Sequence, residues 1–205
     1  MLSNDVYQIL LNRLLTGELL PGDLINRRQI AQELEVSVAP VLEAMVKLEY
    51  DGFLEGMPRK GTRVRPIRRD EVVGQLYLRE GIECMAARLY CGTKVIDTMP
   101  NLCMYAKAAD DDKLPDFEHW KAELAFHKQL VDLAGYSALT QAFDKVAAPY
   151  LFFQIHYLHT VSPRTGLSIH TSLLEKLSTK SPDEAEQAMR AHLRNGREYY
   201  IKEAD

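Results

Sequence analysis

The sequence predicts a mainly α-helical protein in two parts, a small N-terminal part that ends in a β-hairpin and a larger antiparallel all-helical bundle. Two observations lead to this fold class. Apolar residues recur at helical spacing along most of the 205 residues. Strand-like segments occur only between residues 53 and 65, just before the linker 66–69. A hydrophobic fraction of 46% and a charged fraction of 26% are typical of folded chains, so extensive disorder is not expected.

The N-terminal part has the element order helix, helix-turn-helix, hairpin. Its expected elements are a helix over 3–16, a turn over 20–23, a helix from the capping residue Asn26 to about Leu34, a helix from the capping residue Ser37 to about Tyr50, and strands over 53–55 and 62–65. The segment 56–61 is the tip between the strands. This order is that of a winged helix-turn-helix, which we expect as a DNA-binding domain over residues 1–66.

After the linker, residues 70–205 show helical periodicity and no strand-like alternation. Helices are expected near 70–91, 94–110, 116–134, 137–160, 166–179 and 182–203, with breaks that mostly contain glycine or proline. The last helix has a start typical of a capping box, because Ser181 precedes Pro182 and Glu184 follows. Helices of this length with short connections predict an antiparallel bundle.

The composition favours a cytoplasmic protein without a membrane anchor. No apolar run has the length of a membrane span, and residues 1–5 do not open a signal peptide. Three cysteines are an odd number without a C-x-x-C pair, which favours reduced thiols. Because no nucleophile elbow, Walker loop or dinucleotide-binding glycine motif occurs, no catalytic residues are assigned.

A basic segment on an acidic chain indicates an anionic target. The net charge is −4, yet residues 56–69 carry six basic residues and no acidic one. In a helix-turn-helix, the start of the recognition helix meets base edges. We therefore expect a surface for double-stranded DNA made by Arg27, Arg28, Ser37, Val38, Ala39, Pro40, Arg59, Lys60, Gly61 and Arg63. A solvated turn and linker, or a winged helix that binds protein, are the alternatives.

Four residues on three expected helices have the chemistry of metal ligands. Glu123 and His127 are four apart and share a helical face, whereas His170 and His192 lie on the last two helices. Together they predict a site in the bundle core for a divalent metal ion, Zn²⁺ first, with Ni²⁺ or Mn²⁺ as alternatives. Taken singly, each histidine is better explained as a surface or core residue. A rival pair is His156 and His159.

Residues 6–65 resemble the DNA-binding domain of the GntR family of bacterial transcription regulators. The matching stretches are Leu20–Asp23, Ile30–Leu34, Val36–Ser37, Pro40–Val41, Glu43–Ala44, Leu48–Glu49, Gly52–Phe53 and Gly61–Val64. The helical remainder resembles the FadR-type effector domain, called FCD. The resemblance implies a homodimer on a roughly palindromic operator. Val38 and Leu42 stand where the family has recognition-helix arginines, so the operator of relatives does not transfer.

The resemblance also implies that residues 70–205 form an effector-binding and dimerisation domain. The four expected ligands fall on the metal positions of the family, with Glu123 in place of the usual Asp. Arg79 falls on the arginine that meets the carboxylate of a small effector, and a surface ion pair with Glu83 is the alternative. The implied function is a ligand-responsive DNA-binding regulator that senses a small carboxylate metabolite through a metal-containing domain. Two other classes stay open, a small metal-dependent hydrolase-like enzyme and a winged-helix protein-interaction scaffold.

Overall fold

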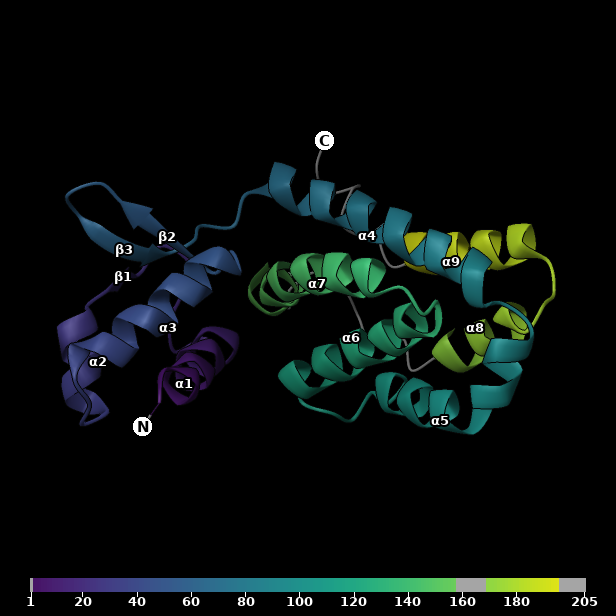
Figure 1. Cartoon of the computed structure of the whole chain (residues 1–205), viewed down its shortest axis with the longest axis horizontal. Coiled ribbons are helices and arrows are strands. Elements are labelled where there is room, and N and C mark those ends of the chain that lie inside the picture. Colours follow the sequence, from purple (N-terminus) through teal and green to yellow (C-terminus); the bar gives the residue numbers. More distant parts are fainter. Residues whose placement is uncertain (1, 158–168, 196–205) are drawn as a thin grey trace. The chain divides into compact units, whose positions relative to one another are not determined.

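The computed structural model describes residues 2–157 and 169–195. The chain divides into two compact units, Met1–Val72 and Val73–Asp205, and Figure 1 shows the elements of each. In the described part of the chain the strands all belong to the first unit, and the second unit is helical. This confirms the predicted fold class. No described helix is both long enough and apolar enough to cross a membrane.

The first unit combines three helices with a three-stranded antiparallel sheet. Its elements are α1 (Ser3–Leu15), β1 (Leu24–Ile25), α2 (Arg27–Glu33), α3 (Val38–Tyr50), β2 (Leu54–Met57) and β3 (Gly61–Val64). The strand order is β1-β3-β2. Helix α1 packs on α3, and the apolar stripes of both helices are buried in this contact. The predicted winged helix-turn-helix is therefore confirmed.

Local details of this unit differ from the sequence prediction. Asn26 caps α2 as expected, because its Oδ1 accepts from the backbone N–H groups of Arg28 and Gln29 at 3.1 and 3.3 Å. Ser37 occupies the N-cap position of α3, but its side chain makes no capping hydrogen bond. The hairpin strands run over 54–57 and 61–64, so both are displaced from their predicted bounds. The short strand β1 was not predicted.

The second unit is a bundle formed by six helices within the described residues. They are α4 (Arg69–Tyr90), which begins in the first unit, α5 (Thr93–Ala109), α6 (Asp116–Leu133), α7 (Ser137–Tyr157), α8 (Ile169–Leu177) and α9 (Pro182–Asn195). Helix α5 packs on α6 and α8, α6 packs on α7, and α8 packs on α9. Helix α4 begins inside the predicted linker. The predicted helix limits at 160, 166 and 203 lie outside the described residues.

Two connections fix the helices that carry the later histidines. Gly92 joins α4 to α5 with a φ of +77°, a conformation that favours glycine, and its N–H donates to the carbonyl of Leu177 at 3.2 Å. Ser181 caps α9 as predicted, because its Oγ accepts from the backbone N–H of Glu184 at 3.3 Å. The end of α8 and the start of α9 are thereby held in the bundle.

Candidate metal centre and nucleic-acid interface

Three histidines from three helices converge in the core of the second unit. His127 lies on α6, His170 on α8 and His192 on α9, and their candidate ligand atoms all lie within 4.8 Å of one another. The Nε2 atoms of His127 and His192 are 3.3 Å apart. His127 and His170 are buried, and His192 is half-buried. The structure therefore brings together the three histidines that the sequence selected.

Two carboxylates orient these imidazoles. An oxygen of Glu83 lies 2.5 Å from Nδ1 of His127, and an oxygen of Asp110 lies 2.8 Å from Nδ1 of His170. Asp110 also accepts from the backbone N–H groups of His170 and Thr171, both at 3.1 Å. With Nδ1 bound to a carboxylate, the Nε2 atom of each ring is the one left to bind a metal ion. The sequence analysis missed this role of both carboxylates.

The fourth predicted ligand, Glu123, is adjacent to the histidine cluster but is shared with Arg79. Its Oε1 lies 3.4 Å from Nε2 of His127 and accepts a hydrogen bond from Nη2 of Arg79 at 3.1 Å. Its Oε2 is buried and has no hydrogen-bond partner in the described part of the chain. A buried carboxylate oxygen without a partner is costly, which makes Glu123 a donor available to a cation.

Arg79 is a buried part of this centre. Only 2% of the residue is exposed, its Nε donates to Glu83 at 2.5 Å, and its guanidinium lies 4.7 Å from the ring centroid of Tyr150. The alternative interpretation of Arg79 and Glu83 as a surface ion pair is therefore wrong. Burial opposes the charge, but the carboxylates of Glu123 and Glu83 more than offset it and raise the pKa of Arg79 above its ordinary value.

The electrostatics of the centre favour the neutral forms of His127 and His192. Burial is the main cause that lowers the pKa of His127 well below its ordinary value, and the charge of Arg79 adds to it. Burial and the neighbouring His127 likewise lower the pKa of His192. Burial alone would raise the pKa of Glu123, but the charge of Arg79 prevails and lowers it. Neutral imidazoles beside an ionised carboxylate form a donor set that suits a divalent metal ion.

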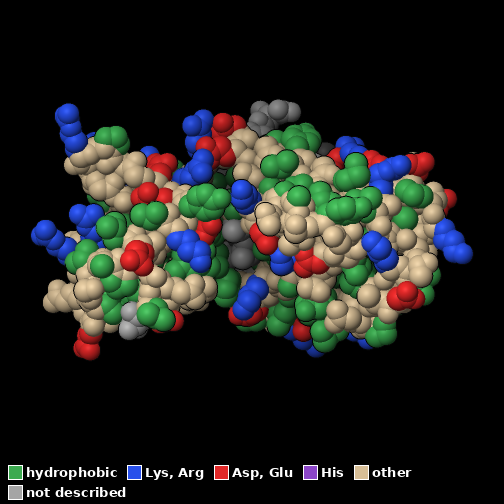
Figure 2. Space-filling view, viewed as in Figure 1, with side chains coloured by type: hydrophobic (Ala, Val, Ile, Leu, Met, Phe, Trp, Pro, Cys, Tyr) green, Lys and Arg blue, Asp and Glu red, His purple; other side chains and the backbone are tan. Residues whose placement is uncertain are grey.

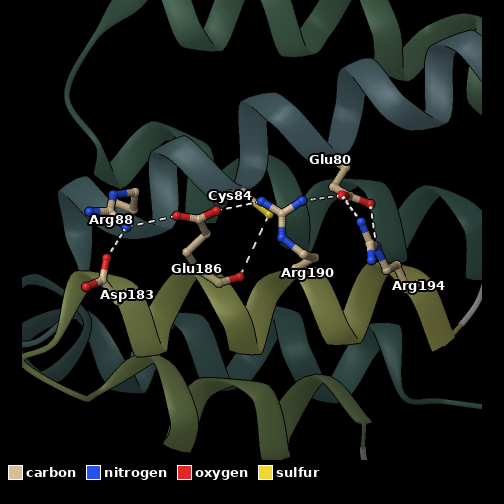
Figure 3. Close-up of polar contacts among 7 residues, drawn as sticks. All are labelled: Glu80, Cys84, Arg88, Asp183, Glu186, Arg190 and Arg194. Carbon is tan, nitrogen blue, oxygen red and sulfur yellow. Dashed lines mark hydrogen bonds and ion pairs between the residues drawn. The ribbon is translucent and has the colours of Figure 1, made fainter.

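Charged side chains join α4 to α9 and so help to position His192 on α9 (Figure 3). We call this group the polar clamp, and it consists of Glu80, Arg88, Asp183, Glu186, Arg190 and Arg194. The buried Glu80 accepts from Arg190 at 2.5 Å and from Arg194 at 3.0 Å, the residues that flank His192 by two positions on α9. Cys84 lies beside these ions and donates to the carbonyl of Glu186 at 3.8 Å. Burial raises the pKa of the Cys84 thiol to about 11, which keeps it protonated.

The rival histidine pair is not described by the structure. His159 lies outside the described residues, and the side chain of His156 is also outside them. His119, which shares α6 with His127, does not belong to the cluster and packs edge-on against the ring of Trp120.

The basic residues of the first unit separate into paired and unpaired groups. Nε of Arg63 lies 2.5 Å from Glu55, and Arg65 and Arg68 pair with Glu71 and Asp70. Within the described part of the chain, no ion pair reaches the exposed Arg27, Arg28, Arg59 and Lys60. Figure 2 shows Lys and Arg side chains projecting over α2 and the β2–β3 tip. The basic surface is thus smaller than the sequence predicts, because carboxylates pair with Arg63, Arg65 and Arg68 and partly neutralise their charges.

The start of α3 presents the other predicted DNA-binding residues. Ser37, Val38 and Ala39 are exposed, and Pro40 is half-buried in the first turn of the helix. Gly61 is exposed at the start of β3, where its φ of +100° is one that glycine favours. A recognition helix beside an exposed basic wing has the arrangement of a DNA-binding module.

A winged helix-turn-helix with an exposed basic wing, followed by a helical bundle, is the architecture of a DNA-binding regulator with a second, helical domain. A family model described as "Bacterial regulatory proteins, gntR family" matches residues 2–64, and the FCD domain model matches residues 76–195. The chain belongs to the GntR family of bacterial DNA-binding transcription regulators and carries an FCD domain. Members of this family are regulators, so the hydrolase-like enzyme is not its class.

Individual relatives agree with this family. The chain is 24% identical over 200 residues to the HTH-type transcriptional repressor RspR of Escherichia coli K12, an alignment that covers 93% of this chain and 85% of the relative. A GntR-type transcriptional regulator from Rhodococcus sp. RHA1 has a TM-score of 0.78 at 18% identity, with coverage of 98% and 97%. E. coli McbR/YncC has a TM-score of 0.75 at 18% identity, with coverage of 100% and 99%. These two solved structures share the fold.

Proposed function

We propose that this regulator binds a divalent metal ion in its FCD domain and that a small carboxylate metabolite binds at the same centre to alter DNA binding. The observation that carries the proposal is the convergence of His127, His170 and His192 within 4.8 Å. Three imidazoles with a nearby carboxylate suit Zn²⁺, with Ni²⁺ or Mn²⁺ as alternatives. Such an ion supplies Lewis-acid attraction for the oxygens of a bound carboxylate.

The side chains of the chain prepare this site before any ligand enters. Glu83 and Asp110 hold the Nδ1 sides of His127 and His170, which directs both Nε2 atoms toward the centre. Glu123 offers Oε2, which has no hydrogen-bond partner among the described residues, as a fourth donor. Because the rings of His127 and His170 are already oriented, little reorganisation opposes ligand binding.

Arg79 is the second anchor for the metabolite in this proposal. A guanidinium binds a carboxylate through two parallel N–H donors, and Arg79 already uses donors toward Glu83 and Glu123. An incoming carboxylate competes with Glu123 for the guanidinium. Because Arg79 and Glu83 lie on α4 and Glu123 on α6, this exchange changes how α4 is held, and α4 is the helix that follows the winged domain in the chain.

We also propose that the chain works as a cytoplasmic homodimer. A single winged domain contacts few base pairs, whereas a dimer doubles the contacts through effective concentration. Two-fold symmetry then matches two half-sites of a roughly palindromic operator.

The test is the metal content of the purified full chain after incubation with Zn²⁺, Ni²⁺ or Mn²⁺ and removal of excess metal. We expect about one ion per chain in the wild type and none in His170→Ala or His192→Ala. His119→Ala is the matched control on α6 and keeps the metal, because His119 is outside the cluster. Metal retained by both cluster variants, or absent from the wild type, contradicts the proposal.

A thermal-shift screen of small mono-, di- and tricarboxylates on the metal-loaded chain tests the effector. A ligand that binds only the folded state raises the melting temperature by mass action. We expect at least one acid to do so in the wild type and to change its affinity for DNA. No stabilisation by any acid, or the same stabilisation in Arg79→Ala, contradicts the role of the metabolite site.

A further inference from the structure

The exposed face at the start of α3 contains almost no hydrogen-bond donors. Over the first two turns the exposed side chains are Val38, Ala39, Leu42 and Glu43, with exposed fractions of 39% for Val38 and 44% for Leu42. One turn later Val46 is 57% exposed on the same face. Large apolar side chains at consecutive i and i+4 positions form an apolar stripe on the outside of the helix, although the inner stripe of α3 already fills the core.

This chemistry restricts what α3 can recognise in a major groove. Arginine reads guanine and asparagine or glutamine reads adenine through paired hydrogen bonds, and no such residue lies on this face of the first two turns. The C5 methyl group of thymine is the apolar group that a base pair presents in the major groove. Glu43 adds an acceptor, which suits the amino group of cytosine.

The charges around the stripe fit DNA as its occupant. Arg27 and Arg28 begin α2, and Arg59 and Lys60 occupy the wing tip, all exposed and without an ion-pair partner in the described part of the chain. Such unpaired cations suit phosphates, which position a protein on the duplex without reading sequence. Glu43 is thus the one acidic group among the exposed side chains of the first two turns of α3, a helix that contacts both α2 and β2.

We propose that this regulator recognises its operator through thymine methyl groups contacted by Val38 and Leu42, and not through arginine–guanine contacts from α3. The operator half-site then has thymines at the positions under the first two turns of α3. This inference rests on DNA binding by the winged domain and is independent of the metal centre.

The experiment selects duplexes from a random library with the full chain and then replaces thymine by uracil, which removes only the methyl group. We expect each contacted thymine to lose about fourfold in affinity on replacement, the ratio that corresponds to about 0.8 kcal/mol for one buried apolar carbon. Uracil in the flanks of the same duplex is the control and leaves affinity unchanged.

A variant links the effect to α3. Leu42→Ala removes an exposed side chain, so folding is preserved. At the thymine that Leu42 contacts, we expect this variant to bind the thymine duplex and the uracil duplex with the same affinity. Leu24→Ala, exposed on β1 of the same unit, is the matched control and keeps the full thymine preference. Equal affinity of the wild type for both duplexes, or a thymine preference that survives Leu42→Ala, overturns the inference while leaving DNA binding intact. A library without any enriched sequence overturns the inference together with specific DNA binding and favours a protein partner for this face.

Discussion

Asp110 is the residue that best shows how the candidate centre is prepared. Its two oxygens accept from Nδ1 and the backbone N–H of His170 and from the backbone and hydroxyl of Thr171. Burial alone would raise the pKa of Asp110, but these hydrogen bonds prevail and lower it. One carboxylate at the end of α5 therefore fixes both the start of α8 and the ring of its histidine.

Replacing Asp110 by asparagine tests this orienting role. An amide carries no charge and polarises the imidazole less, so we expect metal affinity to fall about 10- to 100-fold in Asp110→Asn. Competition with a chromophoric chelator measures the change. The control is Asp111→Asn, next in the chain but exposed. Equal affinities of the two variants would show that Asp110 does not act on the metal.

Arg79 separates metal binding from effector binding. In Arg79→Ala, the buried carboxylates of Glu83 and Glu123 lose their common cation, so we expect the free energy of unfolding of the metal-free chain to fall by about 3–5 kcal/mol. The metal ligands remain, so stoichiometric metal is retained while stabilisation by small carboxylates is lost. Denaturant titration and the carboxylate screen measure the two effects. Loss of metal together with an unchanged effector response would reverse the assigned roles.

Lys60 tests the wing as a phosphate contact. Each phosphate neutralised contributes about one unit to the slope of log affinity against log salt, so Lys60→Ala is expected to lower that slope by about one. Arg68→Ala is the matched control, since Arg68 is also exposed but is paired with Asp70. A slope unchanged in Lys60→Ala would remove the wing tip from the DNA interface.

At the residue scale, sequence patterns selected the histidines that converge in the structure but not the carboxylates that contact them. Each histidine stood on an expected helix, and Glu123 shared a face with His127, so spacing alone was informative. Glu83 contacts a residue 44 positions away, and Asp110 contacts one 60 positions away. Such contacts depend on how α4, α5, α6 and α8 pack, which helical periodicity does not encode.

At the scale of elements, the polar clamp connects α9, which carries His192, to α4, the helix that follows the winged domain in the chain. Arg190 binds both Glu80 and Glu186, while Arg88 binds Glu186 and Asp183. These charges run along one face of α9, and His192 lies between the two arginines that reach Glu80. A change in the clamp is therefore expected to move His192, one of the three candidate metal ligands.

Glu80→Gln tests the clamp. The glutamine keeps the shape but loses the charge that holds Arg190 and Arg194, and we expect about 1–2 kcal/mol less stability because both arginines are partly exposed to screening solvent. Metal affinity should weaken with it, as His192 becomes less fixed. Asp183→Asn, at the exposed end of the clamp, is expected to leave both unchanged. If metal affinity is unaffected in Glu80→Gln, the clamp is structural only.

The elements themselves were largely predictable from the sequence, because each helix buries a stripe of apolar residues at helical spacing. Strand β1 was missed because two residues have no periodicity, and it exists only through pairing with β3, Leu24 opposite Arg63. The hairpin bounds shifted because Phe53 is buried before β2 begins and its carbonyl accepts from Arg65. Tertiary pairing decides such short strands.

At the scale of the whole molecule, the proposed homodimer and the proposed metal centre are two properties that family membership leaves open. A dimer with one centre in each chain carries two ions, and each centre is built from α6, α8 and α9 of a single chain. The mass of the intact assembly therefore reports both the number of chains and the number of bound ions.

Native mass spectrometry of the full chain loaded with Zn²⁺ makes this measurement. The proposal of a metal-binding homodimer predicts a species with the mass of two chains and two divalent ions, and a His170→Ala protein that remains a dimer without ions. A wild type that is a single chain, a dimer that carries no metal, or a His170→Ala dimer that keeps both ions would contradict it.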